Sequence, residues 1–84
     1  MKHETDHTYT LILTVHNNPG VLVRCAQVFN RRGHNIEGLQ VTAVPGSSRQ
    51  SHMSITAFGD AKAMSQITMQ LQKLVDVEHV AMEN

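Results

Sequence analysis

Two asparagines, a proline and a glycine stand together in the stretch His16 to Leu22, which reads HNNPGVL. If this stretch joins a strand to a helix, the unpaired N–H groups at the helix start attract a carboxylate or a phosphate. Gly20 leaves room for such a group. Asn17 and the more distant Asn35 offer donors and acceptors that orient an ammonium or a carboxylate without adding net charge. The same residue types also suit a plain turn, so the residues alone leave both interpretations open.

The segments on either side of this stretch have the periodicities of a strand and a helix. Alternation of apolar residues from Tyr9 to Val15 predicts a strand with one buried face, and only Ile12 breaks the pattern. Asn18 is the expected helix cap, and Pro19 suits the first helical position. Gly33 is expected to end the helix. The apolar stripe of this helix comprises Val21, Leu22, Cys25, Val28 and Phe29.

Four further elements follow from the same patterns. Alternation over 39–43 and 53–57, interrupted by PGSS, predicts a hairpin of two strands. Asp60 is the expected cap of a second helix, whose apolar residues Met64, Ile67, Leu71 and Leu74 recur at spacings of three and four. The closing segment VDVEHVAM is strand-like. Its period slips between Val77 and Val80, which predicts a bulge or a late strand start.

The order strand, helix, strand, strand, helix, strand predicts an α+β fold of the ferredoxin-like, split β-α-β type. Right-handed crossovers place both helices on one face of a four-stranded antiparallel sheet. The other face is then open, and plain solvent exposure of it is favoured over docking of a partner. The side chains expected there are those of Thr10, Ile12, Thr14, Gln40, Thr42, His52, Ser54, Thr56 and Phe58.

Composition restricts the function classes. Eighty-four residues are expected to form one domain over 1–84, with its core at about 9–82. Seven basic and seven acidic residues cancel and Trp is absent, which argues against nucleic acid as a partner. No apolar run is long enough for a bilayer, and the polar N-terminus has no secretion signal. A cytoplasmic protein without a membrane segment is therefore expected.

Histidines and arginines supply secondary hypotheses. The six histidines include no pair with metal-ligand spacing on one element, so no metal site is expected. His16 and His34 flank the stretch of interest in the sequence and could make ligand affinity depend on pH. Arg24, Arg31 and Arg32 lie off the apolar stripe of the first helix, which fits either a solvated face or a contact with a partner protein.

Three sequence blocks carry a family resemblance. They are the N-x-P-G-V-L-x-R motif at Asn17 to Arg24, the RRGHNIE block at Arg31 to Glu37, and QLQKLVDVEHV at Gln70 to Val80. Together they resemble the ACT-type regulatory domain of the small subunit of acetolactate synthase (acetohydroxyacid synthase). The resemblance runs from about Leu11 to Val80, and because the chain ends at Asn84 it is to the short, single-domain kind of small subunit.

This resemblance implies a subunit that has no catalytic residues or cofactors of its own. It would activate a large catalytic subunit, which uses thiamine diphosphate and is expected to hold Mg²⁺ and FAD, and it would bind a branched-chain amino acid, usually valine, for feedback control. ACT domains of this type pair side by side into an eight-stranded sheet, with the effector at the seam. The residues carried over to the effector site are Asn17, Gly20, Val21 and Leu22, with Asn35 and Ile36 from the neighbouring chain.

The resemblance also assigns roles within that site. The helix start at Gly20 to Leu22 would take the effector carboxylate, Asn35 its ammonium, and Val21 and Ile36 its branched side chain. One departure is His52, where an arginine commonly precedes the methionine. Two alternatives stay open: a stand-alone ACT amino-acid sensor that regulates another enzyme, and an enzyme like acylphosphatase. Against the second alternative, this chain lacks the Asn before an Asp-Gly turn that orients the attacking water in acylphosphatases.

Overall fold

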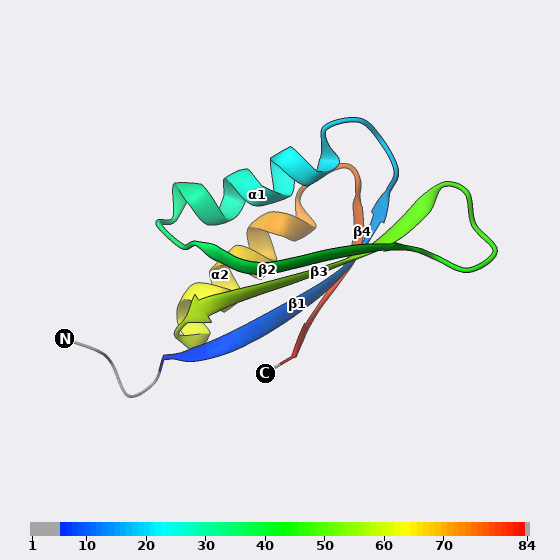
Figure 1. The fold of residues 1–84 in the computed structure, drawn as a ribbon. Coiled ribbons are helices and arrows are strands. Elements are labelled where there is room, and N and C mark those ends of the chain that lie inside the picture. Colours follow the sequence, from blue (N-terminus) through cyan, green and yellow to red (C-terminus); the bar gives the residue numbers. More distant parts are fainter. Residues whose placement is uncertain (1–5, 84) are drawn as a thin grey trace.

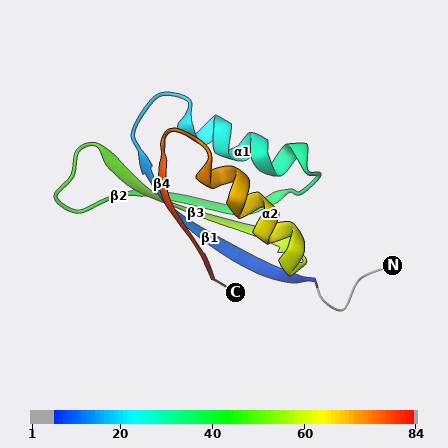
Figure 2. The ribbon, with the colours of Figure 1, turned by 180° about the vertical axis from the view of Figure 1, so that it is seen from behind.

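The architecture is the one that the sequence predicts. The computed structural model describes residues 6–83. Both helices lie on one face of an antiparallel sheet with strand order β2-β3-β1-β4 (Figures 1 and 2). The elements are β1 (His7–His16), α1 (Val21–Arg31), β2 (Ile36–Ala43), β3 (Gln50–Gly59), α2 (Ala61–Gln72) and β4 (Val77–Glu83).

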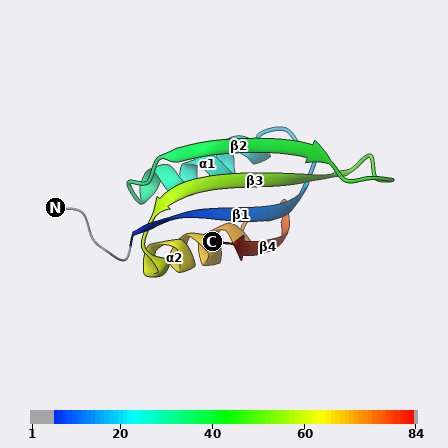
Figure 3. The same ribbon diagram turned by 60° about the horizontal axis from the view of Figure 1, so that its bottom comes forward.

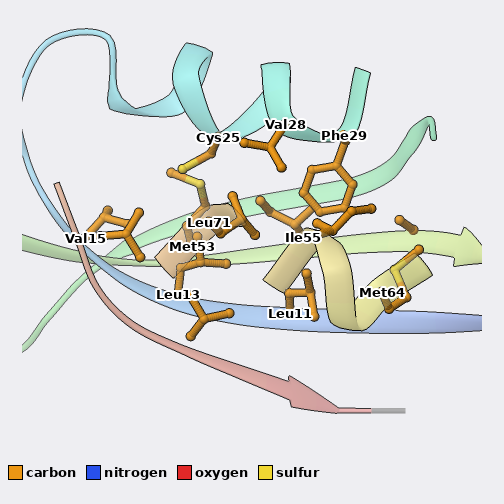
Figure 4. Packing of buried hydrophobic residues seen from close by; sticks show 14 of the residues in the cluster. Leu11, Leu13, Val15, Cys25, Val28, Phe29, Met53, Ile55, Met64 and Leu71 are labelled. Carbon is orange, nitrogen blue, oxygen red and sulfur yellow. The ribbon is translucent and has the colours of Figure 1, made fainter. Parts of the chain in front are cut away.

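The core lies between the sheet and the helices. In the paired central strands, Leu11 is opposite Ile55 and Leu13 is opposite Met53, and each of these side chains is almost fully buried. From above, α1 contributes Phe29 and α2 contributes side chains such as Met64 and Leu71 (Figure 4). Full burial of one such side chain stabilises the fold by about 1.5–3 kcal/mol. The alternation in the strands and the helical stripes therefore converge on one apolar layer.

The end of α1 and the start of α2 lie where the sequence predicts them. Gly33 follows α1 with φ +75°, and its N–H donates to the Asn30 carbonyl at 3.0 Å. The next N–H, of His34, donates to the Phe29 carbonyl at 3.0 Å, which completes a Schellman turn. At the start of α2, the Asp60 side chain accepts a hydrogen bond from the Ala63 N–H at 2.8 Å. The predicted cap is thus confirmed.

The last strand contains the predicted irregularity. Thr14 of β1 pairs with His79 and Val15 pairs with Val77, so Glu78 is an extra residue in β4. The strand also begins late, because β4 starts at Val77 and the Val75 side chain before it is 92% exposed. Both features keep Val77 and Val80 on the core side of the sheet.

The edge strand β2 is largely exposed on both faces. Leu39 and Val41 lie opposite the buried Ile55 and Met53 and therefore on the helix side of the sheet. They nevertheless remain 46% and 48% exposed. The opposite face of the sheet is open, as predicted, and Figure 3 shows its strands from that side. There the Thr10 and Thr56 hydroxyl groups lie 3.3 Å apart.

Cys25 offers a test of how tightly α1 packs on the sheet. Burial raises the pKa of its thiol from an ordinary 9.0 to about 11. The thiol is therefore neutral at pH 8, and thiolate reagents such as DTNB should label the folded protein slowly and the guanidinium-unfolded protein fast. The folded thiol holds its proton more tightly, so its contribution to stability is complete below the unfolded pKa and is lost as pH rises to about 11. Equal labelling rates in the two states would contradict this packing.

Candidate functional site

In the turn between β1 and α1, the N-cap residue of the helix differs from the prediction. Helix α1 begins at Val21, and the residue before it is Gly20, with φ +85° and no side-chain cap. The prediction that Asn18 caps the helix with Pro19 in its first position is therefore wrong. The Asn18 side-chain amide instead donates to the Asp76 carboxylate at 2.7 Å, and the Asn18 backbone carbonyl accepts from the Val21 N–H at 3.2 Å.

Backbone donors are available at this helix start. The first helical hydrogen bond runs from the Arg24 N–H to the Gly20 carbonyl at 3.0 Å. Within residues 6–83, the N–H groups of Leu22 and Val23 have no backbone acceptor. The side chains of Leu22 and Val23 are 40% and 58% exposed, whereas that of Val21 is buried in the core. The apolar surface at the helix start is therefore that of Leu22 and Val23, and Val21 lies beneath it.

Glycine is required at position 20 for two reasons. A φ of +85° is a left-handed conformation that other residues adopt at a cost. A Cβ atom there would also lie 3.0 Å from Nη1 of Arg24. The guanidinium therefore stands beside the turn, close to the exposed helix start.

A buried carboxylate that the sequence analysis missed holds this guanidinium. Asp76 is only 7% exposed, and its two oxygens accept from the Asn18 amide and from Nη2 of Arg24. The hydrogen bond from Asn18, followed by that from Arg24, holds the pKa of Asp76 below its usual range. Arg24 is thus bonded to Asp76, while its side chain stays 44% exposed. The available signal was the single acidic residue between two valines in the VDV segment.

Asn17 is fixed on the other side of the turn. Its side-chain oxygen accepts a hydrogen bond from the hydroxyl of the buried Ser51, and its N–H donates to the Arg49 carbonyl at 2.8 Å. The amide –NH₂ of Asn17 takes no part in these bonds. This group is the donor that Asn17 has left for a ligand.

A polar hollow lies between this turn and the β2–β3 hairpin. Glu78 is one of its lining residues, and its carboxylate is bonded to Nε2 of His16 and to the Gln50 amide, the latter at 2.5 Å. The hydrogen bond from His16, followed by that from Gln50, lowers the pKa of Glu78. The hollow has a volume of about 660 Å³ and is lined by His16, Asn17, Asn18, Ser47, Ser48, Arg49, Gln50 and Glu78.

The second group of predicted site residues lies elsewhere. Asn35 is exposed and Ile36 is half-buried where β2 begins, beyond the C-terminal end of α1. Helix α1 has 11 residues and is about 16 Å long, so one chain does not bring them to Gly20. His34 lies at this far end too, with Nδ1 3.3 Å from the Phe58 carbonyl, so only His16 adjoins the turn.

The structure also bears on a metal site and on membrane-spanning helices. In the part of the chain that the structure describes, no three His, Cys, Asp or Glu side chains come together as a metal site requires. His3 lies outside the described residues. Over the same range, neither helix is long and apolar enough to cross a membrane.

Comparison with known proteins identifies the family. The family described as "AHAS small subunit-like ACT domain" matches residues 11–79, which include the turn, the Asn35 segment and Asp76. The chain belongs to this family. Relatives of this ACT domain include the probable acetolactate synthase small subunit of Methanothermobacter thermautotrophicus, 46% identical over 72 residues. The acetolactate synthase small subunit of Mycobacterium bovis is 46% identical over 70 residues.

The ACT domain accounts for part of each relative. Each of the two alignments covers 83% of this chain and 41% of the relative, so the chain spans less than half of their length. The structure of the Thermotoga maritima acetolactate synthase small subunit superimposes with a TM-score of 0.79 at 36% identity, covering 89% of this chain and 46% of that one. The ACT domain from GTP pyrophosphokinase of Chlorobium tepidum superimposes with a TM-score of 0.77 at 15% identity, covering 95% and 89%, which shows the fold alone.

In this ACT domain, the turn combines amide groups, backbone donors and one guanidinium that is neutralised by Asp76. Such a set suits a small ligand with a carboxylate, held by hydrogen bonds and by the positive end of the helix. It contains no nucleophile paired with a base.

Proposed function

We propose that this chain is a regulatory subunit of acetolactate synthase, which activates the catalytic subunit and binds valine for feedback control. Family membership and the names of the relatives support the association with that enzyme. In this proposal the catalytic partner holds the thiamine diphosphate, Mg²⁺ and FAD, the assembly is cytoplasmic, and this chain contributes binding and regulation only.

The observation that carries the effector site is the placement of its two halves at opposite ends of α1, next to the free edge of β2 (Figure 1). If two copies pair through antiparallel β2 strands, the two-fold axis exchanges these ends. The turn at Gly20 of one protomer then faces the start of β2 of the other. The exposed Leu39 and Val41 lie on this edge and would be covered by such pairing.

Each part of the effector then has a partner in the proposed seam. The exposed N–H groups of Leu22 and Val23 receive the carboxylate, and Asn35 of the neighbouring protomer receives the ammonium. The branched side chain lies between Leu22 and the neighbour's Ile36. The family resemblance placed Val21 in contact with that side chain, but Val21 is buried in the core, so we assign this contact to Leu22.

Regulation follows from the sharing of one ligand by two protomers. An effector that bridges the seam favours one seam geometry over others, and a catalytic subunit docked on the dimer responds to that geometry. The effect is a coupling free energy between the two sites, typically about 1–3 kcal/mol.

The test is a calorimetric titration of the purified chain with L-valine, L-leucine and L-isoleucine, with D-valine as the control. We expect saturable binding of at least one of the L-amino acids and weak or no binding of D-valine. Co-expression with a catalytic subunit should give a complex whose acetolactate synthesis exceeds that of the catalytic subunit alone. Absence of binding for all three amino acids would contradict the effector site, and failure to activate would contradict the subunit assignment.

A further inference from the structure

Asp76 is a buried charged residue that the proposed function leaves without a role. It lies in the connection between α2 and β4, immediately before the strand with the bulge. Buried carboxylates are costly unless each oxygen is paired, so a fold that keeps one usually depends on its partners. The partners of Asp76 are His16 at the end of β1, Asn18 in the turn and Arg24 in the first turn of α1.

Three contacts tie these two connections together. The carboxylate accepts from the Asn18 amide at 2.7 Å and from Arg24, and the Asp76 carbonyl accepts from the His16 N–H at 2.8 Å. These contacts hold the chain both before and after Gly20. The turn between them is exposed and contains a glycine in the left-handed region, so its shape depends on these contacts and on the hydrogen bonds that hold Asn17.

Arg24 connects this anchor to the helix start. One of its terminal nitrogens, Nη2, is bonded to Asp76, while Nη1 lies 3.0 Å from the point where a Cβ of residue 20 would be. The Arg24 side chain is 44% exposed, so the guanidinium is accessible beside the turn. A guanidinium has five donors, and one carboxylate does not use all of them.

We propose that Asp76 is a positioning residue for the effector-binding turn, and that Arg24, which it holds beside Gly20, contacts the effector carboxylate. This inference rests on the function proposed above. It makes the carboxylate recognition charge-assisted, since the guanidinium and the positive end of α1 act on the same group. It also explains why an acidic residue far along the chain belongs to the site.

The experiment compares four variants of the whole chain. Asp76→Asn keeps the size of the side chain but removes the charge that holds Arg24, and Arg24→Gln removes the guanidinium. Asp60→Ala is the control for stability, because it removes the cap of α2 without touching the turn. Lys62→Gln is the control for charge, because it removes an exposed cation from α2, which carries neither half of the proposed site.

The readouts are L-valine affinity by calorimetry, the melting temperature, and amide hydrogen exchange. Asp76→Asn and Arg24→Gln should each weaken valine binding by about tenfold or more, the usual effect of losing one charge-assisted hydrogen bond. Asp76→Asn should also speed exchange of the amides in 17–24. Asp60→Ala should lower the melting temperature and leave valine affinity unchanged, and Lys62→Gln should change neither.

The outcomes separate this inference from the proposed function. Wild-type affinity in Asp76→Asn, or an equal loss of affinity in Asp60→Ala, would overturn the positioning role. Wild-type affinity in Arg24→Gln would overturn the contact with the carboxylate. If the wild-type chain binds no amino acid, the effector proposal and the Arg24 contact both fail. Unchanged exchange over 17–24 in Asp76→Asn would then also reject Asp76 as the anchor of the turn.

Discussion

Replacement of Gly20 by aspartate is expected to abolish valine binding while the chain stays folded. The new Cβ would lie 3.0 Å from Nη1 of Arg24, which places the new carboxylate at the guanidinium and at the start of α1. That is where the effector carboxylate is proposed to bind. The introduced group therefore both occupies the position and repels the ligand. Loss of about 3 kcal/mol or more, a factor above 100 in affinity, is expected from a displaced and repelled carboxylate.

Gly20→Asp should also lower the stability of the fold, independently of the ligand. A non-glycine residue at φ +85° costs roughly 1–2 kcal/mol of backbone strain. Gly46→Asp is the matched control, because Gly46 has φ +80°, a Cβ there meets no atom within 4 Å, and the residue belongs to neither half of the proposed site. Both variants should lower the melting temperature by similar amounts, and only Gly20→Asp should lose valine in calorimetry. Equal affinities in the two variants would place the effector elsewhere.

The elements were predictable from the sequence because burial leaves a local periodicity. Leu11, Leu13 and Val15 alternate because every second side chain of β1 faces the core. The irregularity in β4 was visible for the same reason, since a bulge shifts the period by one residue between Val77 and Val80. Asp60 was recognised because a helix cap involves residues only three apart.

The polar anchor of the turn was not predictable in this way. Asn18 has the residue type and position of a helix cap, and nothing local argues against that role. Its actual partner, Asp76, is 58 residues further along the chain. Only the fold brings the α2–β4 connection to the β1–α1 turn, where the buried Asp76 carboxylate accepts a hydrogen bond from the Asn18 amide. Local rules fail here because the deciding interaction is a long-range pairing of polar groups.

The second half of the site shows a different limit. Asn35 and Ile36 were assigned to the site by the family resemblance, and the structure of one chain places them at the far end of α1 from Gly20. Neither the sequence pattern nor a single chain determines whether the two ends meet. In the proposed dimer they meet across the seam, so the proposal depends on the oligomeric state.

Replacement of Val41 by lysine is expected to separate the dimer and to remove valine binding with it. Val41 is 48% exposed on the edge strand β2, so the substitution costs little in the isolated chain. In a two-fold seam it places two lysines against each other's apolar surface, and lysine on an edge strand opposes pairing. The dissociation constant of the dimer should rise by at least about 100-fold, the effect of burying unpaired charges.

The matched control is Met82→Lys on the opposite edge strand, β4. Met82 is 41% exposed and lies opposite Leu11, on the helix side of the sheet like Val41. Sedimentation equilibrium should show monomers for Val41→Lys and dimers for Met82→Lys, and calorimetry should show valine binding only for the second. If Met82→Lys separates the chains and Val41→Lys does not, the seam runs along β4 and the shared site proposed here is wrong.

A mixture of Gly20→Asp and Asn35→Ala chains tests the sharing of the site directly, because each replacement should weaken or abolish valine binding when it is present in both protomers. In a dimer of one Gly20→Asp chain and one Asn35→Ala chain, one seam site carries both replacements and the other carries neither. Half of the dimers in an equal mixture combine both chains, so about a quarter of the wild-type valine capacity should return after exchange. Mass spectrometry of differently tagged chains establishes that exchange has occurred. Exchange without recovered binding would mean that Gly20 and Asn35 do not meet across two chains, whereas recovery requires that they do.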